Sequence, residues 1–444
     1  MKTYMIPTKA IPLDDSWDVI VAGGGPAGCT AAAAAAREGA RTLLVEATGS
    51  LGGMGTAGMV PAWCPFSDKE KIIYRGLAEK VFIALKKQMP HVPEDALDWV
   101  PIEPEKLKRV YDDLVTEAGV TVLFHTFLAA VEADEEGRVQ TLLVASKAGL
   151  QALKAKVFVD CTGDADLAAW AGADYMKGSE KSGQLQPATH CFALGNVDEY
   201  AYRTGPNLHG ENKASPIYDI VQAGQYPLIP DFHMCNNLTG PRTVGFNAGH
   251  LWEVDNTDPY TVSAALIKGR RMAESYCSAL AEHQPAAFGN AYVAATGALM
   301  GIRETRRIEG DYVLTTEDYV ERRSFPDEIC RNSYFIDIHG SEEEEKTGVN
   351  SQALRHYGPG ESHGIPYRCL TPKKLRNVLV AGRSISCDRR VQGSVRVMPA
   401  CLATGEAAGL AAALAAKLPE GNVHRVDTAL LRRRLREEGA YLPE

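Results

Sequence analysis

The pattern of apolar and polar positions begins with a short apolar strand and an alanine-rich helix. Residues 17–22 are apolar and are followed by glycines, which predicts a strand, and residues 26–38 predict a helix that ends at Gly39. A second apolar run, residues 42–45, completes a strand–helix–strand unit. The chain therefore opens with the kind of unit from which α/β sheets are built.

The next part of the chain alternates between helical and extended patterns. Helical patterns occupy residues 71–88 and 104–118, and short strands follow between residues 120 and 159, with Gly137 and Gly149 in the turns. We assign residues 14–175 to one part of a first domain.

The composition changes at about residue 176, where Asn, His, Tyr and Pro become more frequent and Ala less so. We place a second domain at residues 176–340, with one helix marked by Asp258 as N-cap and Pro259 at the first helical position. Residues 341–420 return to the earlier style, with a strand at 378–381 and a small-residue helix at 399–417. Residues 421–444 form a charged helical tail, and the acidic run 342–345 is interpreted as a solvated turn.

Composition and charge exclude several classes of protein. The 444 residues are 45% hydrophobic and 23% charged, which excludes general disorder, collagen and a coiled-coil rod. A formal net charge of −9 gives no basic field for nucleic acid, so no nucleic-acid partner is expected. The uncharged residues 19–36 are interrupted by glycines and proline, and the alanine-rich run at 407–416 is only ten residues long. We therefore expect a soluble protein without a membrane partner.

The ten cysteines carry no local ligand spacing. No CxxC pair exists, and the closest two cysteines are 14 residues apart. This spacing argues against a local zinc or iron–sulfur site and favours free thiols, and hence a cytoplasmic location.

The strongest motif is the hexad from Gly23 to Gly28, which fits GxGxxG. It follows a strand and opens a helix, and Glu46 stands 18 residues after Gly28 at the end of the next strand. In such a turn Gly25 lets the backbone approach a pyrophosphate, the helix start holds the phosphate charge, and the carboxylate accepts hydrogen bonds from a ribose. The alternative, a glycine turn that binds no ligand, is disfavoured by this spacing. The hexad by itself does not distinguish NAD from FAD, because both fit it.

Further motifs indicate which cofactor is bound. They are the loop LGGMGT from Leu51, VDCTGDAD from Val159, GIRETRRIEGDYVLT from Gly301, IPYRCL from Ile365, AGRSIS from Ala381 and GSVRVMPACLATGEAAG from Gly393. With these motifs the chain, from about residue 18 to 414, resembles FAD-dependent oxidoreductases of the FAD_oxidored type, within the glutathione-reductase-like FAD-binding superfamily.

The resemblance implies an α/β fold, with a Rossmann-like FAD-binding domain of the glutathione-reductase type and an inserted α+β substrate domain. It also implies that the flavin lies near residues 394–398, with the N-terminus of the following helix directed at it. The residues that it implies for FAD binding are Gly23, Gly25, Pro26, Ala27, Gly28, Glu46, Ala47, Gly52, Gly53, Met54, Gly163, Asp164, Gly382, Arg383, Arg396 and Met398. For Arg396, a surface salt bridge is the alternative.

Absent motifs narrow the expected reaction. The chain has neither a second GxGxxG nor a pair of closely spaced cysteines after Glu46, so a disulfide reductase is not expected. We expect a dehydrogenase or oxidase that passes a hydride from a small polar substrate to flavin N5, with oxygen, a quinone or a carrier protein as acceptor. The alternatives are a flavin monooxygenase using NAD(P)H and an electron-transfer subunit without its own substrate. The oligomeric state stays open, a homo-oligomer included.

The candidate catalytic residues are His339, Arg303 and Tyr367. His339 follows an apolar strand pattern and suits acid–base chemistry, with a purely structural histidine as the alternative. Arg303 is one of three arginines in five positions, which indicates either a clamp for an anion or an internal ion-pair network with Glu304, Glu309 and Asp311. Weaker histidine candidates are His190, His233, His250 and His363. We expect no metal site from them, because HxH and HxxxH spacings do not occur.

Overall fold

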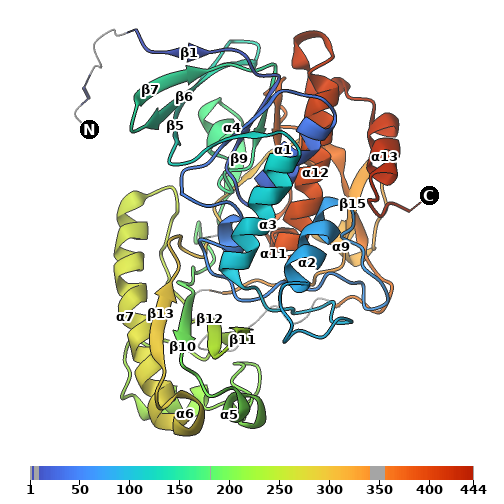
Figure 1. The fold of residues 1–444 in the computed structure, drawn as a ribbon. Coiled ribbons are helices and arrows are strands. Elements are labelled where there is room, and N and C mark those ends of the chain that lie inside the picture. Colours follow the sequence, from blue (N-terminus) through green and yellow to red (C-terminus); the bar gives the residue numbers. More distant parts are fainter. Residues whose placement is uncertain (1–2, 5–9, 181, 341–355, 444) are drawn as a thin grey trace.

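The structure is a computed structural model that describes residues 3–4, 10–180, 182–340 and 356–443 (Figure 1). The predicted boundary at residue 341 and the acidic run 342–345 lie outside the described residues.

A five-stranded parallel sheet collects strands from distant parts of the chain. Its central strands are buried along their whole length because helices cover the sheet, which explains why they are apolar at every position. The strand order is β17 (Val378–Val380), β8 (Val157–Asp160), β2 (Val19–Ala22), β3 (Thr42–Val45) and β4 (Thr121–Leu123). One strand thus comes from the C-terminal part, where the sequence returns to the style of the first domain.

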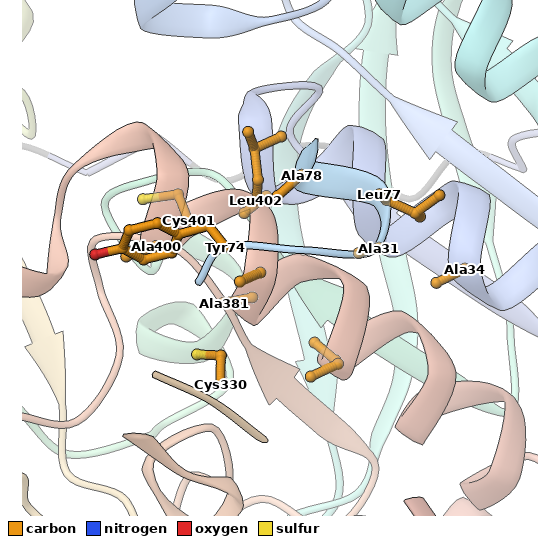
Figure 2. Close-up of a cluster of buried hydrophobic side chains, with 14 of the residues drawn as sticks. Ala31, Ala34, Tyr74, Leu77, Ala78, Cys330, Ala381, Ala400, Cys401 and Leu402 are labelled. Atoms are coloured by element: carbon orange, nitrogen blue, oxygen red, sulfur yellow. The ribbon is translucent and has the colours of Figure 1, made fainter. Parts of the chain in front are cut away.

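Two small-residue helices, α1 (Pro26–Arg37) and α12 (Met398–Ala415), pack against each other at very short distance. A Cβ atom added at Gly409 would lie 1.9 Å from the carbonyl oxygen of Ala31. The Thr30 hydroxyl donates a hydrogen bond of 2.8 Å to the Leu402 carbonyl across the contact. Figure 2 shows part of the buried cluster to which Ala31 and Leu402 belong. The alanine and glycine content of both helices is therefore a packing requirement.

Helix α12 is long and apolar enough to cross a membrane by length and composition alone, with a mean hydropathy of 1.3. The apolar stretch is longer than the ten residues considered in the sequence, because Glu406 does not interrupt the helix. In the fold, 94% of this stretch is buried inside the protein, as in the core helix of a soluble protein.

A second sheet and two helices complete the N-terminal part, where the sequence predicted short strands and two helices. The helices are α2 (Leu77–Lys86) and α3 (Pro104–Glu117), and a short helix, α4 (Asp166–Trp170), follows β8. The sheet has the order β1 (Leu13–Asp14), β7 (Gly149–Leu153), β6 (Val139–Ser146) and β5 (Phe127–Ala133).

The inserted part forms the lower lobe in Figure 1 and has its own hydrophobic core between Ala188 and Ile302. Its long helix α7 (Pro259–His283) begins as predicted, because the Asp258 side chain accepts a hydrogen bond from the Tyr260 N–H. Its antiparallel sheet has the order β11 (Met234–Gly240), β12 (Thr243–Ala248), β10 (Phe192–Gly195) and β13 (Tyr292–Thr296). The remaining helices are α5 (Glu199–Thr204), α6 (Ile217–Ala223) and α8 (Pro285–Phe288).

The segment that follows the insertion, residues 306–340, is here called the return segment. It packs on the part of the protein that contains the parallel sheet and does not belong to the hydrophobic core of the insertion. Leu314, Ile329 and Ile336 belong to the same buried cluster as α1 and α12. The core of the insertion is thus narrower than the predicted 176–340. The elements of this region and of the C-terminal part are β9 (Tyr175–Lys177), β14 (Arg306–Ile308), α9 (Thr316–Val320), β15 (Glu328–Asn332), β16 (His363–Pro366), α11 (Arg389–Val395) and α13 (Thr428–Glu437).

Candidate functional site

The glycine hexad adopts the close turn that the sequence predicted. Gly23 has a φ of +95°, and an added Cβ would lie 2.4 Å from the carbonyl oxygen of Cys161. An added Cβ at Gly28 would lie 1.7 Å from the Gly23 oxygen, so α1 starts directly on the turn. At Gly25, in contrast, an added Cβ would meet no protein atom within 4 Å. The turn therefore opens onto free space at the start of α1, which has no side-chain cap.

Glu46 lies beside this turn with both carboxylate oxygens in use. One oxygen accepts the Gly24 N–H at 2.6 Å and the other accepts the Thr48 N–H at 2.7 Å. The side chain is buried. Because each carboxylate oxygen has two lone-pair sites, Glu46 keeps one acceptor position on each oxygen for a ligand.

The predicted loop after Glu46 folds back onto the hexad. The Gly52 N–H donates to the Gly24 carbonyl at 2.8 Å, and an added Cβ at Gly53 would lie 3.0 Å from the Gly25 Cα. A short 3₁₀ turn, η1 (Gly53–Gly55), follows and contains Met54. An added Cβ at Gly55 would lie 3.2 Å from the sulfur of Met398, so this turn brings the hexad close to the start of α12.

The two later segments predicted to bind cofactor lie side by side. The Ser384 hydroxyl donates to the Gly163 carbonyl at 2.6 Å, and Arg383 pairs with Asp164 at 2.8 Å. An added Cβ at Gly382 would lie 3.1 Å from the Cβ of Ala27 in α1. The two segments and α1 therefore border one glycine-lined cradle, although the Asp164 carboxylate is already bonded to Arg383 and other side chains of the protein.

This cradle has the features that an adenine dinucleotide requires. The open backbone at Gly25 and the uncapped N-terminus of α1 suit a pyrophosphate, and the free acceptor positions of Glu46 suit a ribose diol. The residues present therefore fit FAD.

Comparison with known families gives the same answer. The sequence profile for "FAD dependent oxidoreductase" matches residues 18–435, almost the whole chain. The protein belongs to the FAD-dependent oxidoreductase family. FAD as cofactor, the Rossmann-type α/β fold and the enzyme class predicted from the sequence are thereby confirmed.

Solved structures resemble this FAD-dependent oxidoreductase only distantly. A geranylgeranyl bacteriochlorophyll reductase-like protein from Thermoplasma acidophilum is 12% identical, with a TM-score of 0.44 and coverage of 96% of this chain and 83% of that one. CabE, an aromatic hydroxylase from angucycline biosynthesis, is 13% identical, with a TM-score of 0.48 and coverage of 95% and 68%. The p-nitrophenol 4-monooxygenase PnpA from Pseudomonas putida DLL-E4 is 12% identical, with a TM-score of 0.43 and coverage of 95% and 84%. Such values transfer no reaction to this oxidoreductase.

A group of histidines lies at the end of the β11–β12 hairpin in the inserted part. His233 directly precedes β11 and His250 follows β12 after Gly249, whose N–H donates to the His233 carbonyl at 2.9 Å. The two imidazole rings stack with centroids 4.4 Å apart. Gly249 is required there, because it has a φ of +70° and an added Cβ would lie 2.4 Å from the side chain of Met272.

His339 joins this group from the return segment and completes a chain of hydrogen bonds. Its Nδ1 lies 2.9 Å from His250 Nε2, and its Nε2 lies 3.4 Å from an Asp337 oxygen. His250 Nδ1 lies 2.9 Å from an Asp231 oxygen. Asp337 also pairs with Arg396 at 3.1 Å. The order is thus Asp231, His250, His339, Asp337 and Arg396, with a carboxylate on either side of the two imidazoles.

Two glutamines connect this series of interacting side chains to α11, which leads into the predicted flavin segment. The side-chain NH₂ group of Gln186 donates to the side-chain oxygen of Gln392 at 3.1 Å. The side-chain oxygen of Gln186 accepts the backbone N–H of His339 at 3.3 Å. Gln392 also donates to the Arg303 carbonyl at 2.8 Å. The histidines are therefore held at the junction of the inserted part with residues 389–398.

Burial and nearby positive charge decide the protonation of this group. Burial and the charge of Arg303 lower the pKa of His339 to about 3, against which Asp337 acts in the opposite direction. Burial and the neighbouring histidines hold the pKa of His233 well below its ordinary value. Burial by itself would raise the pKa of Asp337, but His339, Arg396 and Arg303 together hold it far below its usual range. His233 and His339 are therefore neutral at pH 7, between ionised carboxylates.

Arg303 lies next to the histidines, as a clamp for an anion requires. Its Nη1 donates to the Pro187 carbonyl and the Thr189 hydroxyl, both at 2.8 Å, and its Nη2 lies 3.5 Å from His233 Nε2. The other two arginines of the motif form internal ion pairs, Arg306 with Asp166 and Arg307 with Glu304. The ion-pair interpretation thus applies to Arg306 and Arg307, with Glu304 as the one predicted partner among these two pairs, and the clamp stays a prediction for Arg303.

The three histidines also meet the spatial requirement for a metal centre, since one nitrogen of each lies within 4.8 Å of the others. The sequence argument against a histidine metal site rested on local spacing. That argument does not hold in the fold, because His233, His250 and His339 converge from separate segments. The signal from which the proximity of His233 and His250 was predictable is their position at the two ends of a segment with the turn sequence Gly240-Pro241 near its middle.

Several other candidates do not join this group. The Tyr367 hydroxyl donates to the Val423 carbonyl at 2.8 Å, so its only proton is used within the protein, and its role as a donor near the flavin stays a prediction. His190 is buried and bonded to the Gly297 carbonyl at 2.8 Å, and His363 is buried and bonded to Tyr357. Arg396 is largely buried and paired with Asp337, and therefore is not a surface salt bridge.

Proposed function

We propose that this protein is an FAD-dependent dehydrogenase or oxidase of a small polar substrate, in which the paired histidines take up the substrate's proton. The observation that carries the proposal is the bonded chain from Asp231 through His250 and His339 to Asp337. FAD, when bound, supplies the acceptor for the hydride that leaves the substrate carbon. Oxygen, a quinone or a carrier protein is then the class of compound that takes the electrons.

Oxidation of an alcohol or amine removes a hydride from carbon and a proton from oxygen or nitrogen, so the enzyme needs a base within reach of that proton. His339 is neutral and 16% exposed, which leaves it accessible to a small molecule. A proton taken up at His339 Nε2 releases the proton on Nδ1, which passes along the 2.9 Å contact to His250 Nε2, and Asp231 stabilises the resulting imidazolium. Asp337 keeps the His339 ring oriented from the other side.

The cofactor contacts follow from the glycine-lined cradle. Gly25 and the start of α1 would hold the pyrophosphate, and Glu46 would hold the ribose nearest to it. Arg396, which links Asp337 to the segment before α12, would lie between the base and the flavin. A positive charge there favours negative charge on a reduced flavin ring.

A cytoplasmic location belongs to the same proposal. All ten cysteines, every one of them among the described residues, are free thiols. Free thiols are typical of a reducing compartment.

The test is anaerobic reduction of the FAD-loaded protein by single compounds, followed as loss of flavin absorbance at about 450 nm. The panel contains hydroxy acids, amino acids, neutral alcohols, neutral amines and NADPH. We expect bleaching by at least one class of alcohol or amine and none by NADPH alone. Rapid bleaching by NADPH alone would assign a monooxygenase instead, and bleaching by no compound would indicate an electron-transfer subunit.

A further inference from the structure

Arg303 differs from the other arginines around the site in the partners that it has. It is buried, with 6% of its surface exposed. Among the residues that the structure describes, its guanidinium has only neutral hydrogen-bond partners: a carbonyl, a hydroxyl and an imidazole. Four other arginines around the site each pair with a carboxylate: Arg306 with Asp166, Arg307 with Glu304, Arg383 with Asp164 and Arg396 with Asp337. Asp337 acts on Arg303 electrostatically but pairs with Arg396 and His339 instead. A buried guanidinium with no carboxylate of its own is costly to maintain, which indicates that a ligand supplies the charge.

The geometry shows where that ligand would lie. The two 2.8 Å hydrogen bonds from Nη1 to Pro187 and Thr189 fix the plane of the guanidinium. The other terminal nitrogen, Nη2, is 3.5 Å from His233 Nε2 and thus faces the histidine group. His233 is in ring contact with both His250 and His339. An anion bound at Nη2 would therefore lie against the two residues proposed to take the proton.

We propose that Arg303, oriented by His233, forms a subsite for a carboxylate, so that the substrate of this enzyme is an organic acid such as a hydroxy acid or an amino acid. This inference rests on the proposed function and names its substrate class. A carboxylate matches a guanidinium with two parallel hydrogen bonds, which a neutral hydroxyl or carbonyl does not. The fixed plane of Arg303 makes this match available without reorganisation.

The same subsite couples binding to proton uptake. Among the described residues, the titratable groups that face His339 are Asp337, His250 and His233, with Arg303 and Arg396 behind them. The positive charge of Arg303 is one of the two main causes that lower the pKa of His339. A bound carboxylate compensates that charge, so the basicity of His339 rises when the substrate is in place. His339 is therefore a stronger base with an acid bound than in the free site, although burial still lowers its pKa.

A metal ion on the three histidines would exclude this arrangement. A divalent cation bound to His233 would stand close to the guanidinium of Arg303, and both would be positive. The proposal therefore predicts that the purified protein holds no stoichiometric transition metal. Elemental analysis showing one zinc or iron per chain, lost in His250→Ala, would overturn it.

The binding test uses propionate and its neutral isostere propionamide, titrated into the FAD-loaded protein and followed by the difference spectrum of the flavin. We expect a saturable change with propionate and at least about tenfold weaker binding of propionamide. Arg303→Met should weaken propionate binding by about tenfold or more, and Arg303→Lys by a smaller factor. Arg433→Met removes an equal charge from the exposed surface of α13 and serves as the matched control, with propionate binding unchanged.

Equal binding of propionate and propionamide, or unchanged propionate binding in Arg303→Met, would overturn the subsite. Retained FAD absorbance and melting temperature show that a variant is folded; if Arg303→Met fails this check, Arg303→Lys is the deciding variant. If Arg303 proves necessary for propionate but no compound bleaches the flavin, the subsite stands and the proposed function falls. If neutral alcohols bleach the flavin as fast as acids, the function stands and the subsite falls.

Discussion

His250 Nε2 and His339 Nδ1 lie 2.9 Å apart, although 89 positions of the chain separate the two residues. The other nitrogen of each ring faces a carboxylate, at 2.9 Å for His250 and at 3.4 Å for His339. If His250 directs its Nδ1–H at Asp231, its Nε2 lone pair accepts the Nδ1–H of a neutral His339, and the lone pair of His339 Nε2 is left facing the Asp337 carboxylate. A proton taken up at His339 Nε2 removes this repulsion, so the pair is arranged to receive a proton from a substrate and to relay one to His250.

The first prediction concerns this pair. His339→Ala should leave FAD bound but slow flavin reduction by a good substrate by about 100-fold or more, which is the usual scale for loss of a general base. The measurement is stopped-flow bleaching under anaerobic conditions. Asp231→Asn, which touches His250 and not His339, should change the pH dependence of reduction more than the affinity for substrate. Unchanged kinetics in His339→Ala would reduce this residue to a structural role.

The second prediction concerns cofactor retention. Glu46→Ala removes the acceptor that faces the hexad and leaves the Gly24 and Thr48 N–H groups without their partner. We expect weaker FAD binding and an unchanged circular dichroism spectrum, measured as the flavin content after gel filtration. Glu135→Ala, in the exposed turn between β5 and β6, is the matched control and should retain FAD fully. Full flavin content in Glu46→Ala would contradict the proposed ribose contact.

The third prediction is a pH dependence of stability. Burial and the charges of Arg331 and Arg322 lower the pKa of the buried His363 to about 3, whereas its unfolded value is 6.5. Above pH 6.5 His363 is neutral in both states. As the pH falls from 6.5 towards 3, the unfolded chain gains a proton that the folded protein excludes, so stability is lost.

The size of this effect is measurable with a variant. Between pH 7 and pH 5 a single histidine with these values costs about 2 kcal/mol of unfolding free energy. His363→Gln should therefore lose less stability between the two pH values than the parent protein, by about that amount. Urea unfolding at both pH values is the measurement. An identical loss in parent and variant would show that His363 is not held neutral by the fold.

The fourth prediction concerns the contact of α1 with α12. Gly→Ala inside a helix ordinarily stabilises by up to about 1 kcal/mol. At Gly409 the added methyl would lie 1.9 Å from the Ala31 carbonyl oxygen, so we expect a loss of about 1–3 kcal/mol instead. Thermal unfolding gives the sign directly. A higher melting temperature for Gly409→Ala would show that the helices separate without cost.

The cofactor-binding part was largely predictable from the sequence, because its signals are local. The hexad, the strand before it, the helix after it and Glu46 lie within 30 residues, and backbone sterics and burial act at that range. The N-cap at Asp258 and the small-residue helix near the C-terminus are local signals of the same kind, and both helices form.

The arrangement of the proposed base and its neighbours was decided only by the tertiary structure. The sequence indicated His339 by the apolar strand pattern before it, but its partner His250 and the carboxylate of Asp231 come from a hairpin end whose position depends on how the inserted sheet packs. The same holds for Arg303, which the motif could not distinguish from Arg306 and Arg307. The three arginines have the same side-chain chemistry. Whether a carboxylate lies beside an arginine in the fold decides whether it forms an ion pair or is available to a ligand.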